Sequence, residues 1–239
     1  MLEDLNLTHV LFLDIETVPQ YPDFNQLPES TQRLWAKKAK TLYKDEDNSP
    51  SEIYSRAGIY AEFGKIICIS AGVIFEENKE RKLRLKSFFS DDERKLLTDF
   101  SDMVEKFSSD KKVNLCAHNG KEFDFPYIAR RILINRLKLP KILQVAGKKP
   151  WDVPFLDTME LWRFGDYKNY TSLELLTHIF DIETPKQDID GSMVNQVYWQ
   201  NKELDRIVEY CQRDVVAIAQ LMLRYKGDKL IDEKNIEIA

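Results

Sequence analysis

The hydrophobic pattern of the chain opens with a short apolar run that reads as a buried strand over residues 9–16, ended by the prolines that follow it. Two later runs, Lys65–Phe75 and Lys82–Phe89, are predicted as strands. The polar turn Glu76–Arg81 joins them, which is typical of a β-hairpin. A shorter apolar run, Val113–Ala117, predicts a fourth buried strand.

Four further segments are predicted as helices: Asp92–Phe107, Pro126–Leu137, a segment running from the capping box Thr171-Ser172-Leu173-Glu174 to about Phe180, and about Glu203–Tyr225. The last carries an apolar stripe at Leu204, Ile207, Val208, Cys211, Val215, Ile218 and Met222. Strands followed by strands that alternate with helices indicate an α/β layered sheet. The hairpin makes this sheet mixed rather than fully parallel.

The remaining segments are polar. Residues 20–60 contain prolines and a predicted helix from about Glu29 to Tyr43, and we interpret them as an insertion rather than a domain. Residues 140–154 are predicted as a loop, and about 227–239 as a polar tail. We therefore expect one domain over residues 1–239.

Composition supports a soluble globular chain, since 43% of the 239 residues are hydrophobic and 31% are charged. The longest nearly unbroken apolar run, Ile66–Phe75, is too short to span a bilayer, and the acidic start does not resemble a secretion signal. Cys68, Cys116 and Cys211 are odd in number and widely spaced, which fits neither a disulfide framework nor a zinc site. We therefore expect a reducing, cytoplasmic location and no membrane partner.

The net charge is −5, which counts against a protein that coats nucleic acid through a basic face. It does not exclude an enzyme that grips one chain end, because bound metal ions supply positive charge.

Four acidic residues in three separated segments carry the candidate chemistry. Asp14 and Glu16 lie two residues apart on the first strand, so both carboxylates point to one side, where they are costly unless neutralised. Asp124 and Asp214 are the other two. The letters Asp-Ile-Glu-Thr recur at Asp181–Thr184, after a helix and before a proline, and that copy predicts a solvated turn.

Each acid has an ordinary alternative reading. Asp124 taken alone fits the N-cap of the next helix, and Asn119 and Gly120 fit a simple turn. Tyr210 and Asp214 are four residues apart on one helix face, at the border of the buried stripe, where an acid is commonly half-solvated or ion-paired. Clustered carboxylates nevertheless hold hard divalent cations, and paired cations hydrolyse phosphodiesters, so the combination predicts a metal-dependent nuclease.

The three segments resemble the three exonuclease motifs of the DnaQ-like, or DEDD, superfamily of 3′–5′ exonucleases. Residues 12–17, Phe-Leu-Asp-Ile-Glu-Thr, resemble the first motif. Residues 119–128, Asn-Gly-Lys-Glu-Phe-Asp-Phe-Pro-Tyr-Ile, are similar to the second motif of family B DNA polymerase proofreading domains. Residues 210–214, Tyr-Cys-Gln-Arg-Asp, resemble the tyrosine (DEDDy) variant of the third, and neither His118 nor His178 is placed as the histidine subclass requires.

The resemblance spans roughly Val10 to Leu223 and is nearest to free-standing bacterial exonucleases related to the polymerase B proofreading domain. It implies a ribonuclease-H-like fold with a five-stranded mixed sheet flanked by helices. It also implies two Mg²⁺ or Mn²⁺ ions, with catalytic and metal-binding roles for Asp14, Glu16, Asp124 and Asp214 and a catalytic role for Tyr210. Asp14 would bridge the ions, Glu16 and Asp214 would hold the one carrying the attacking water, and Asp124 would support the other.

By the same resemblance, four residues are expected to contact the terminal nucleotides: Thr17, His118, Asn119 and Phe123. Core packing is the alternative for Phe123. Candidates for the phosphate backbone are Lys148, Lys149, Arg130 and Arg131, although such charges are commonly just solvated. Because 25 residues follow Asp214, we expect no polymerase domain, and replication or repair proteins are candidate partners.

Several alternatives stay open at this point. The polymerase-like second motif favours the 3′ end of single-stranded DNA over RNA as substrate, with nucleoside 5′-monophosphates as products. An RNA 3′–5′ exonuclease, a non-catalytic module that binds nucleic acid or a polymerase, and an endonuclease on the same fold are the competing readings. The sequence does not indicate oligomeric state, processivity, strand preference or pathway.

Overall fold

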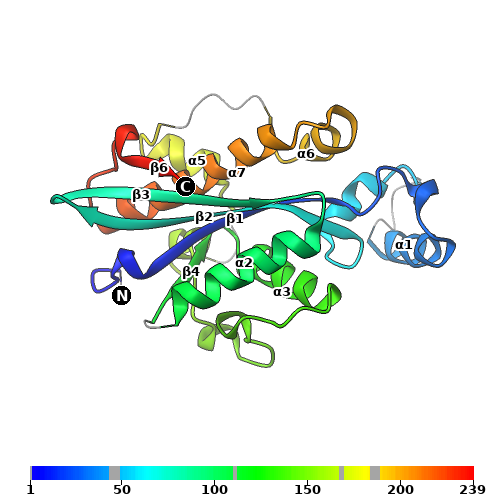
Figure 1. The fold of residues 1–239 in the computed structure, drawn as a ribbon, viewed down its shortest axis with the longest axis horizontal. Coiled ribbons are helices and arrows are strands. Elements are labelled where there is room, and N and C mark those ends of the chain that lie inside the picture. Colours follow the sequence, from blue (N-terminus) through cyan, green and yellow to red (C-terminus); the bar gives the residue numbers. More distant parts are fainter. Residues whose placement is uncertain (1, 43–48, 110–111, 167–169, 184–188) are drawn as a thin grey trace.

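The computed structural model describes residues 2–42, 49–109, 112–166, 170–183 and 189–239. Its centre is a six-stranded sheet in the order β5-β4-β1-β2-β3-β6 (Figure 1). The strands are β1 (Val10–Pro19), β2 (Gly64–Glu77), β3 (Glu80–Phe89), β4 (Asn114–Ala117), β5 (Phe155–Asp157) and β6 (Ile236–Ile238).

The sheet is mixed, as the hairpin predicts. β1 runs antiparallel to β2 and parallel to β4, while β2 runs antiparallel to β3. β5 extends the parallel side beyond β4, and β6 pairs in parallel with β3. The expected count of five strands was one too few, because Ile236–Ile238 in the predicted polar tail pairs with Leu83–Leu85. A three-residue strand has too short an alternation to be recognised from sequence.

Seven α-helices lie in the described part of the chain: α1 (Glu29–Leu42), α2 (Glu93–Ser108), α3 (Asp124–Ile134), α4 (Thr158–Arg163), α5 (Leu173–Ile179), α6 (Val194–Gln196) and α7 (Leu204–Lys226). A π-helical turn, η6 (Val197–Asn201), follows α6. The short 3-10 turns are η1 (Leu7–His9), η2 (Phe24–Gln26), η3 (Tyr54–Ile59), η4 (Lys141–Leu143), η5 (Pro150–Asp152) and η7 (Glu233–Asn235). None of the described helices is long and apolar enough to cross a membrane.

Helices cover both faces of the sheet, with α2 and α3 on one side and α7 on the other (Figure 1). The alternation along β1 divides its side chains between these two layers. Leu11, Leu13 and Ile15 pack in the cluster with α2 and α3. Val10 and Phe12 pack in the cluster with α7. The predicted α/β layering is therefore confirmed.

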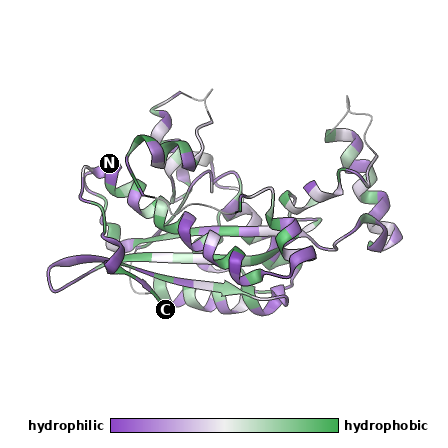
Figure 2. Ribbon diagram, turned by 90° about the horizontal axis from the view of Figure 1, so that it is seen from above, coloured by the Kyte–Doolittle hydropathy of each residue, from purple (hydrophilic) through white to green (hydrophobic). Residues whose placement is uncertain are grey.

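Element boundaries follow local chemistry closely. The predicted hairpin is confirmed, but its turn is tighter than expected. Asn78 and Lys79 have φ angles of 53° and 65°, as a two-residue turn requires, so the strands run on to Glu77 and from Glu80. Figure 2 shows the polar character of this hairpin tip. The cap of α5 is Ser172, one residue after the predicted Thr171.

Residues 20–42 and 49–63 form a small layer of their own beside the end of β1. Trp35 of α1 is fully buried against aromatic neighbours there. The helix predicted from Glu29 is confirmed to Leu42, whereas Tyr43 lies outside the described residues. The hydroxyl of Tyr127 on α3 donates a hydrogen bond of 2.6 Å to the carbonyl of Gly58, which fastens this layer to the main core.

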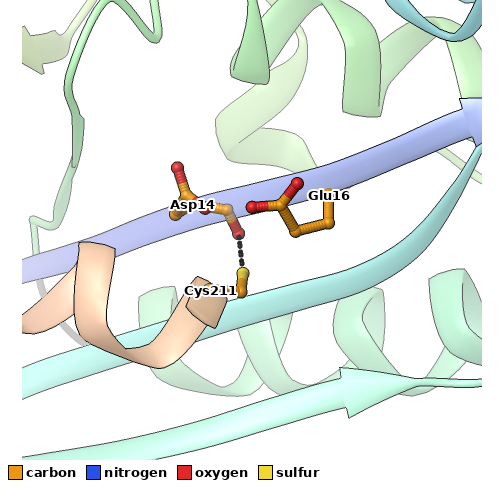
Figure 3. A group of neighbouring side chains, drawn as sticks. All are labelled: Asp14, Glu16 and Cys211. Carbon is orange, nitrogen blue, oxygen red and sulfur yellow. Dashed lines mark hydrogen bonds between the residues drawn. The ribbon is translucent and has the colours of Figure 1, made fainter. Parts of the chain in front are cut away.

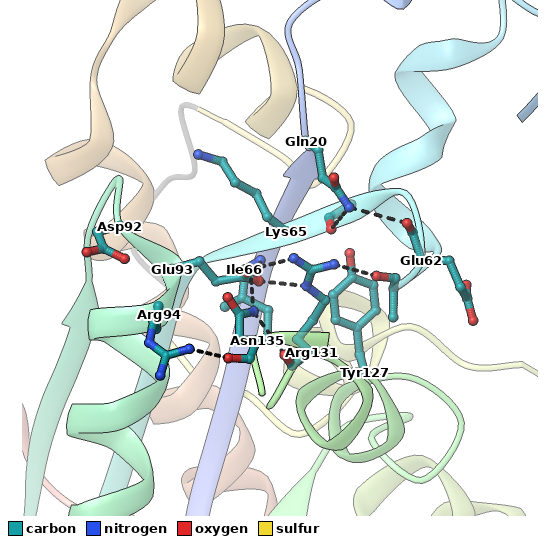
Figure 4. A network of polar contacts seen from close by, with 12 residues as sticks. Gln20, Glu62, Lys65, Ile66, Asp92, Glu93, Arg94, Tyr127, Arg131 and Asn135 are labelled. Carbon is teal, nitrogen blue, oxygen red and sulfur yellow. Dashed lines mark hydrogen bonds and ion pairs between the residues drawn. The ribbon is translucent and has the colours of Figure 1, made fainter. Parts of the chain in front are cut away.

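A buried ion pair fixes α2 and α3 to β2 (Figure 4). Glu93 accepts hydrogen bonds from the guanidinium of Arg131, at 2.8 and 2.5 Å, and from the main-chain N–H of Ile66 at 2.7 Å. Arg131 is only 5% exposed. The suggestion that Arg131 meets a phosphate backbone was therefore wrong, because its guanidinium is buried and already hydrogen-bonded to Glu93.

Candidate active site

Asp14 and Glu16 continue the row of β1 side chains that faces α7. β4 pairs with β1 only from Val10 to Phe12, so beyond Phe12 this edge of β1 is open to other partners. On the other edge Glu16 lies opposite Cys68 of β2, and the register shifts immediately after it. The two carboxylates thus stand at the point where the parallel part of the sheet ends.

Cys211 of α7 approaches both acids. One carboxylate oxygen of Asp14, one of Glu16 and the Sγ of Cys211 all lie within 4.8 Å of one another (Figure 3). The thiol donates a hydrogen bond of 3.4 Å to the main-chain carbonyl of Asp14. All three cysteines of the chain are free and buried, as expected.

Asp124 is the first residue of α3 and is 4% exposed. Its carboxylate accepts a hydrogen bond from the main-chain N–H of Ile15, the residue between Asp14 and Glu16. The N-cap position belongs to Phe123, which makes no side-chain cap bond, so the alternative reading of Asp124 as an N-cap was wrong. The Asp124 carboxylate instead lies beside the other acids.

Tyr210 and Asp214 enter the same cluster from α7. The Tyr210 hydroxyl hydrogen-bonds to the Asp214 carboxylate, one helical turn away. Both residues are half-buried, which agrees with their predicted place at the border of the apolar stripe. Arg213 lies near Asp214, and its positive charge lowers the pKa of that carboxyl.

Burial and mutual repulsion act together on these acids. The pKa of Asp14 is raised well above 3.8, first by burial and then by the negative charges of Asp214, Asp124 and Glu16. Burial and the Asp214 charge are also the two largest causes that raise the pKa of Glu16. The tertiary structure therefore brings all four predicted acids within electrostatic reach of one another.

The other members of the cluster are shifted in the same direction. Burial raises the pKa of Asp124 to about 7, and the hydrogen bond from Ile15 works against that rise. Burial raises the pKa of Asp214 to about 6, although its bond with Tyr210 lowers it. Burial and the Asp214 charge raise the pKa of Tyr210, so its hydroxyl stays protonated near neutral pH.

The donor set suits a hard divalent cation. Asp14 Oδ2 is buried and has no hydrogen-bond partner among the described residues, which is costly for a carboxylate. No lysine or arginine of the described residues pairs with Asp14, Glu16 or Asp124. Carboxylate oxygens are the ligands that Mg²⁺ and Mn²⁺ prefer, so cations would satisfy the orphan oxygen and relieve the repulsion.

The loop after β4 is held by a residue that the sequence analysis missed. Asp157, at the end of β5, accepts the main-chain N–H groups of Asn119 and Lys121, both at 3.0 Å. It also caps α4 by accepting from Met159. The signal was present, because an acid stands at the end of a short apolar run and opens a helix, but a three-residue strand did not stand out.

The predicted substrate contacts lie around this loop. Both ring nitrogens of His118 form hydrogen bonds of 2.9 Å, Nδ1 with the hydroxyl of Thr158 and Nε2 with the main-chain carbonyl of Thr171. Asn119 has a φ of 60°, and its buried side-chain Oδ1 has no hydrogen-bond partner within the described ranges. Phe123 is half-buried and packs against the ring of Tyr127, with the centroids 5.3 Å apart. Their contacts with a substrate stay predictions, as does that of Thr17, which hydrogen-bonds to Tyr127.

The second copy of the acidic tetrapeptide is separate from the site. Asp181 and Glu183 are exposed, and Asp181 adopts a φ of 49° in a turn after α5, which confirms the predicted solvated turn. Thr184 lies outside the described residues. Lys148 and Lys149 are exposed in the loop before β5, away from the strand ends that carry the acids, and Arg130 is exposed on α3.

Comparison with known proteins settles the family. Residues 59–233 match the family described as predicted 3′–5′ exonucleases related to the exonuclease domain of PolB. The chain belongs to this family. The matched segment contains Asp124, Tyr210 and Asp214, whereas Asp14 and Glu16 precede it.

The fold is also similar to a solved structure, the family B DNA polymerase from the hyperthermophilic archaeon Pyrobaculum calidifontis. The TM-score is 0.52 and the sequence identity 16%. The similarity covers 91% of this chain and 24% of the polymerase chain. The expected ribonuclease-H-like fold is thus confirmed, with one additional edge strand. The chain matches none of the curated protein sequences with which it was compared.

Proposed function

We propose that this protein is a metal-dependent 3′–5′ exonuclease that removes nucleoside 5′-monophosphates from the 3′ end of single-stranded DNA. The observation that carries the proposal is the convergence of four acids from β1, α3 and α7, with a buried oxygen of Asp14 that has no partner in the part of the chain that the structure describes. A cluster of this kind is unfavourable without cations and is the usual setting for phosphodiester hydrolysis.

The charges of Asp214, Asp124 and Glu16 all act on Asp14, which supports it as the residue that would help to hold both ions. Glu16 and Asp214 would hold one ion, and Asp124, on the other side of β1, would hold the second. When bound, a pair of divalent cations supplies a water of lowered pKa and stabilises the charge on the departing 3′ oxygen.

The chain's own residues position the reactants. The Tyr210 hydroxyl is anchored on Asp214 and stays protonated, so it orients the attacking water rather than removing its proton. The charge of Asp214 also acts on Glu16, and Glu16 helps to orient that water. The main chain of Asn119 is held by Asp157, and its buried Oδ1 has no partner among the described residues, which supports a role in accepting a hydrogen bond from a hydroxyl of the terminal sugar.

The experiment is digestion of a 5′-labelled single-stranded DNA and a matched RNA in Mg²⁺ or Mn²⁺, with analysis of the shortened strands and of the released nucleotides. We expect stepwise release of 5′-monophosphates, faster from DNA, and no cleavage of a closed circular strand. Asp14→Asn should abolish hydrolysis. Cys211→Ser, which alters a neighbour of the same carboxylates, should retain most of it, because Mg²⁺ prefers oxygen ligands.

Three outcomes would redirect the assignment. Equal or faster degradation of RNA would change the substrate class while keeping the chemistry. Cleavage of the circular strand would indicate an endonuclease. Absence of any metal-stimulated hydrolysis in the wild-type protein would favour a non-catalytic module that binds nucleic acid.

A further inference from the structure

Two lysines converge on one tryptophan at the end of β1. The Nζ of Lys65, from β2, lies 5.0 Å from the centre of the Trp199 ring, and the Nζ of Lys202 also lies 5.0 Å from it. Both distances fall within the range of a cation–π interaction. Trp199 belongs to the π-helical turn η6, and Lys202 follows this turn with a φ of 61°. Such turns occur frequently at functional sites.

This cluster is continuous with the acidic site. The Nε1 of Trp199 donates a hydrogen bond of 3.2 Å to the carbonyl of Pro19, which is three residues beyond Glu16 on β1. At about 3.3 Å of rise per residue, the indole is fixed about 10 Å farther along the strand. Tyr210 packs against the same apolar cluster as Trp199. A strand bound at the acids can therefore pass over Trp199.

The positive charges here are only partly neutralised. Lys65 donates one hydrogen bond, 2.8 Å, to the hydroxyl of Tyr198, which in turn donates to Asp91 at 2.6 Å. Figure 4 shows the Lys65 side chain extending away from Glu93, whose carboxylate is paired with Arg131. Lys202 is exposed and has no ion-pair partner among the described residues. The carboxylates of Asp91 and Glu93 both act on the Lys65 ammonium, but Asp91 accepts from Tyr198 and Glu93 is paired with Arg131.

Bringing like charges together costs free energy. Burial lowers the pKa of Lys65, the charges of Asp91 and Glu93 work against this, and the charge of Lys202 acts in the same direction as burial. A chain with a net charge of −5 has no general excess of cations to place here. An anion bound beside the two ammonium groups would relieve this repulsion, as backbone phosphates do in single-strand binding grooves that combine basic and aromatic side chains.

We propose that Lys65 and Lys202, arranged around Trp199, form a binding site for a backbone phosphate of the substrate strand, upstream of the bond that is cleaved. The site rests on the proposed exonuclease function for its continuity with the acids. It gives the enzyme a preference for strands longer than a dinucleotide, because a dinucleotide without a 5′ phosphate contains only the scissile phosphate.

The test compares Lys202→Gln, Lys202→Glu and the double variant Lys65→Gln/Lys202→Gln with wild type. Hydrolysis is measured in Mn²⁺ on an unphosphorylated dinucleotide and on a longer single strand. Binding of the longer strand is measured by fluorescence anisotropy in Ca²⁺. The matched control is Lys79→Gln, since Lys79 is also exposed at a positive φ, 65°, but lies in the β2–β3 turn.

We expect Lys202→Gln to raise the KM and the Kd for the longer strand about 3- to 10-fold, with a larger effect for Lys202→Glu and for the double variant. The slope of log Kd against log salt should fall by about 0.7, the value for one phosphate contact on a single strand. Dinucleotide hydrolysis should stay unchanged, as should the thermal stability of the two Lys202 single variants and every Lys79→Gln value.

Equal effects of the Lys202 variants on dinucleotide and longer strand, or no effect on either KM or Kd, would overturn the phosphate site. Failure of the wild-type protein to hydrolyse any strand, with the Kd differences still present, would overturn the exonuclease function and leave the phosphate site standing.

Discussion

The main-chain N–H of Ile15 donates a hydrogen bond to the carboxylate of Asp124. This bond joins β1 to α3 between Asp14 and Glu16, at the place where β4 no longer pairs with β1. It fixes the third acid relative to the first two without using a side chain of β1. The spacing of the candidate metal ligands is therefore built from the backbone of the sheet.

The raised carboxyl pKa values predict how stability depends on pH without metal. Asp124 and Asp214 have pKa values of about 7 and about 6 in the folded protein, above the ordinary 3.8. Protonation therefore favours the folded state. This contribution is complete below the unfolded pKa and is lost as pH rises through the folded values. Each tenfold difference in proton affinity between the folded and unfolded states corresponds to about 1.4 kcal/mol.

In a chelator, the Tm should fall by several degrees between about pH 5 and about pH 8, given about 2–4 °C for each kcal/mol in a chain of this size. Mg²⁺ or Mn²⁺ should raise the Tm at the upper pH, because the cations bind only the folded cluster. Calorimetry with and without chelator measures this. Asp124→Asn should flatten the dependence, and a Tm that is independent of pH and metal would contradict the clustering.

Tyr210→Phe removes the hydroxyl that is hydrogen-bonded to Asp214. We expect kcat to fall about 10²-fold with KM nearly unchanged, since a misplaced nucleophile costs about this much. Steady-state kinetics on a single strand measure both. Tyr170→Phe, at an exposed tyrosine, is the control and should match wild type. A loss as complete as that of Asp14→Asn would show that the hydroxyl does more than position water.

Asp157→Asn tests the support of the loop after β4. Its carboxylate accepts from Asn119 and Lys121, and its charge contributes to the raised pKa of Asp124. The substitution should lower stability by about 1–3 kcal/mol. It should also move the acidic limb of the pH–rate profile to lower pH, because the pKa of Asp124 falls. Asp181→Asn, in the exposed turn, should do neither, and an unmoved limb would remove Asp157 from the electrostatics of the site.

Gly120→Ala tests how closely Gly120, in the same loop, packs against Ala117 and Phe125. A Cβ at Gly120 would lie 2.4 Å from that of Ala117 and 3.1 Å from the ring of Phe125, so the loop must shift. We expect a loss of about 1–3 kcal/mol in the free energy of unfolding, and reduced activity. Gly191→Ala, where none of the described residues lies within 4 Å of the added Cβ, is the matched control. Chemical denaturation compares the two, and equal stabilities would show that the loop gives way freely.

Local patterns in the sequence determined much of this protein. The two-residue period of β1 places Asp14 and Glu16 on one face, and the helical period of α7 aligns Tyr210 with Asp214. Both periods depend only on backbone geometry within one element, so they can be read before any tertiary contact is known. The apolar runs predicted four strands and the main helices for the same reason.

Only the tertiary structure decided what depends on distant segments meeting. Asp157 reaches the loop of Asn119 from a strand too short to recognise, and β6 completes the sheet from a tail that reads as polar. Arg131, an ordinary surface candidate in the sequence, is buried on Glu93, whereas Lys65 and Lys202 meet at one indole. Such meetings depend on how sheet and helices pack, and no period within a single element encodes which segments will pack together.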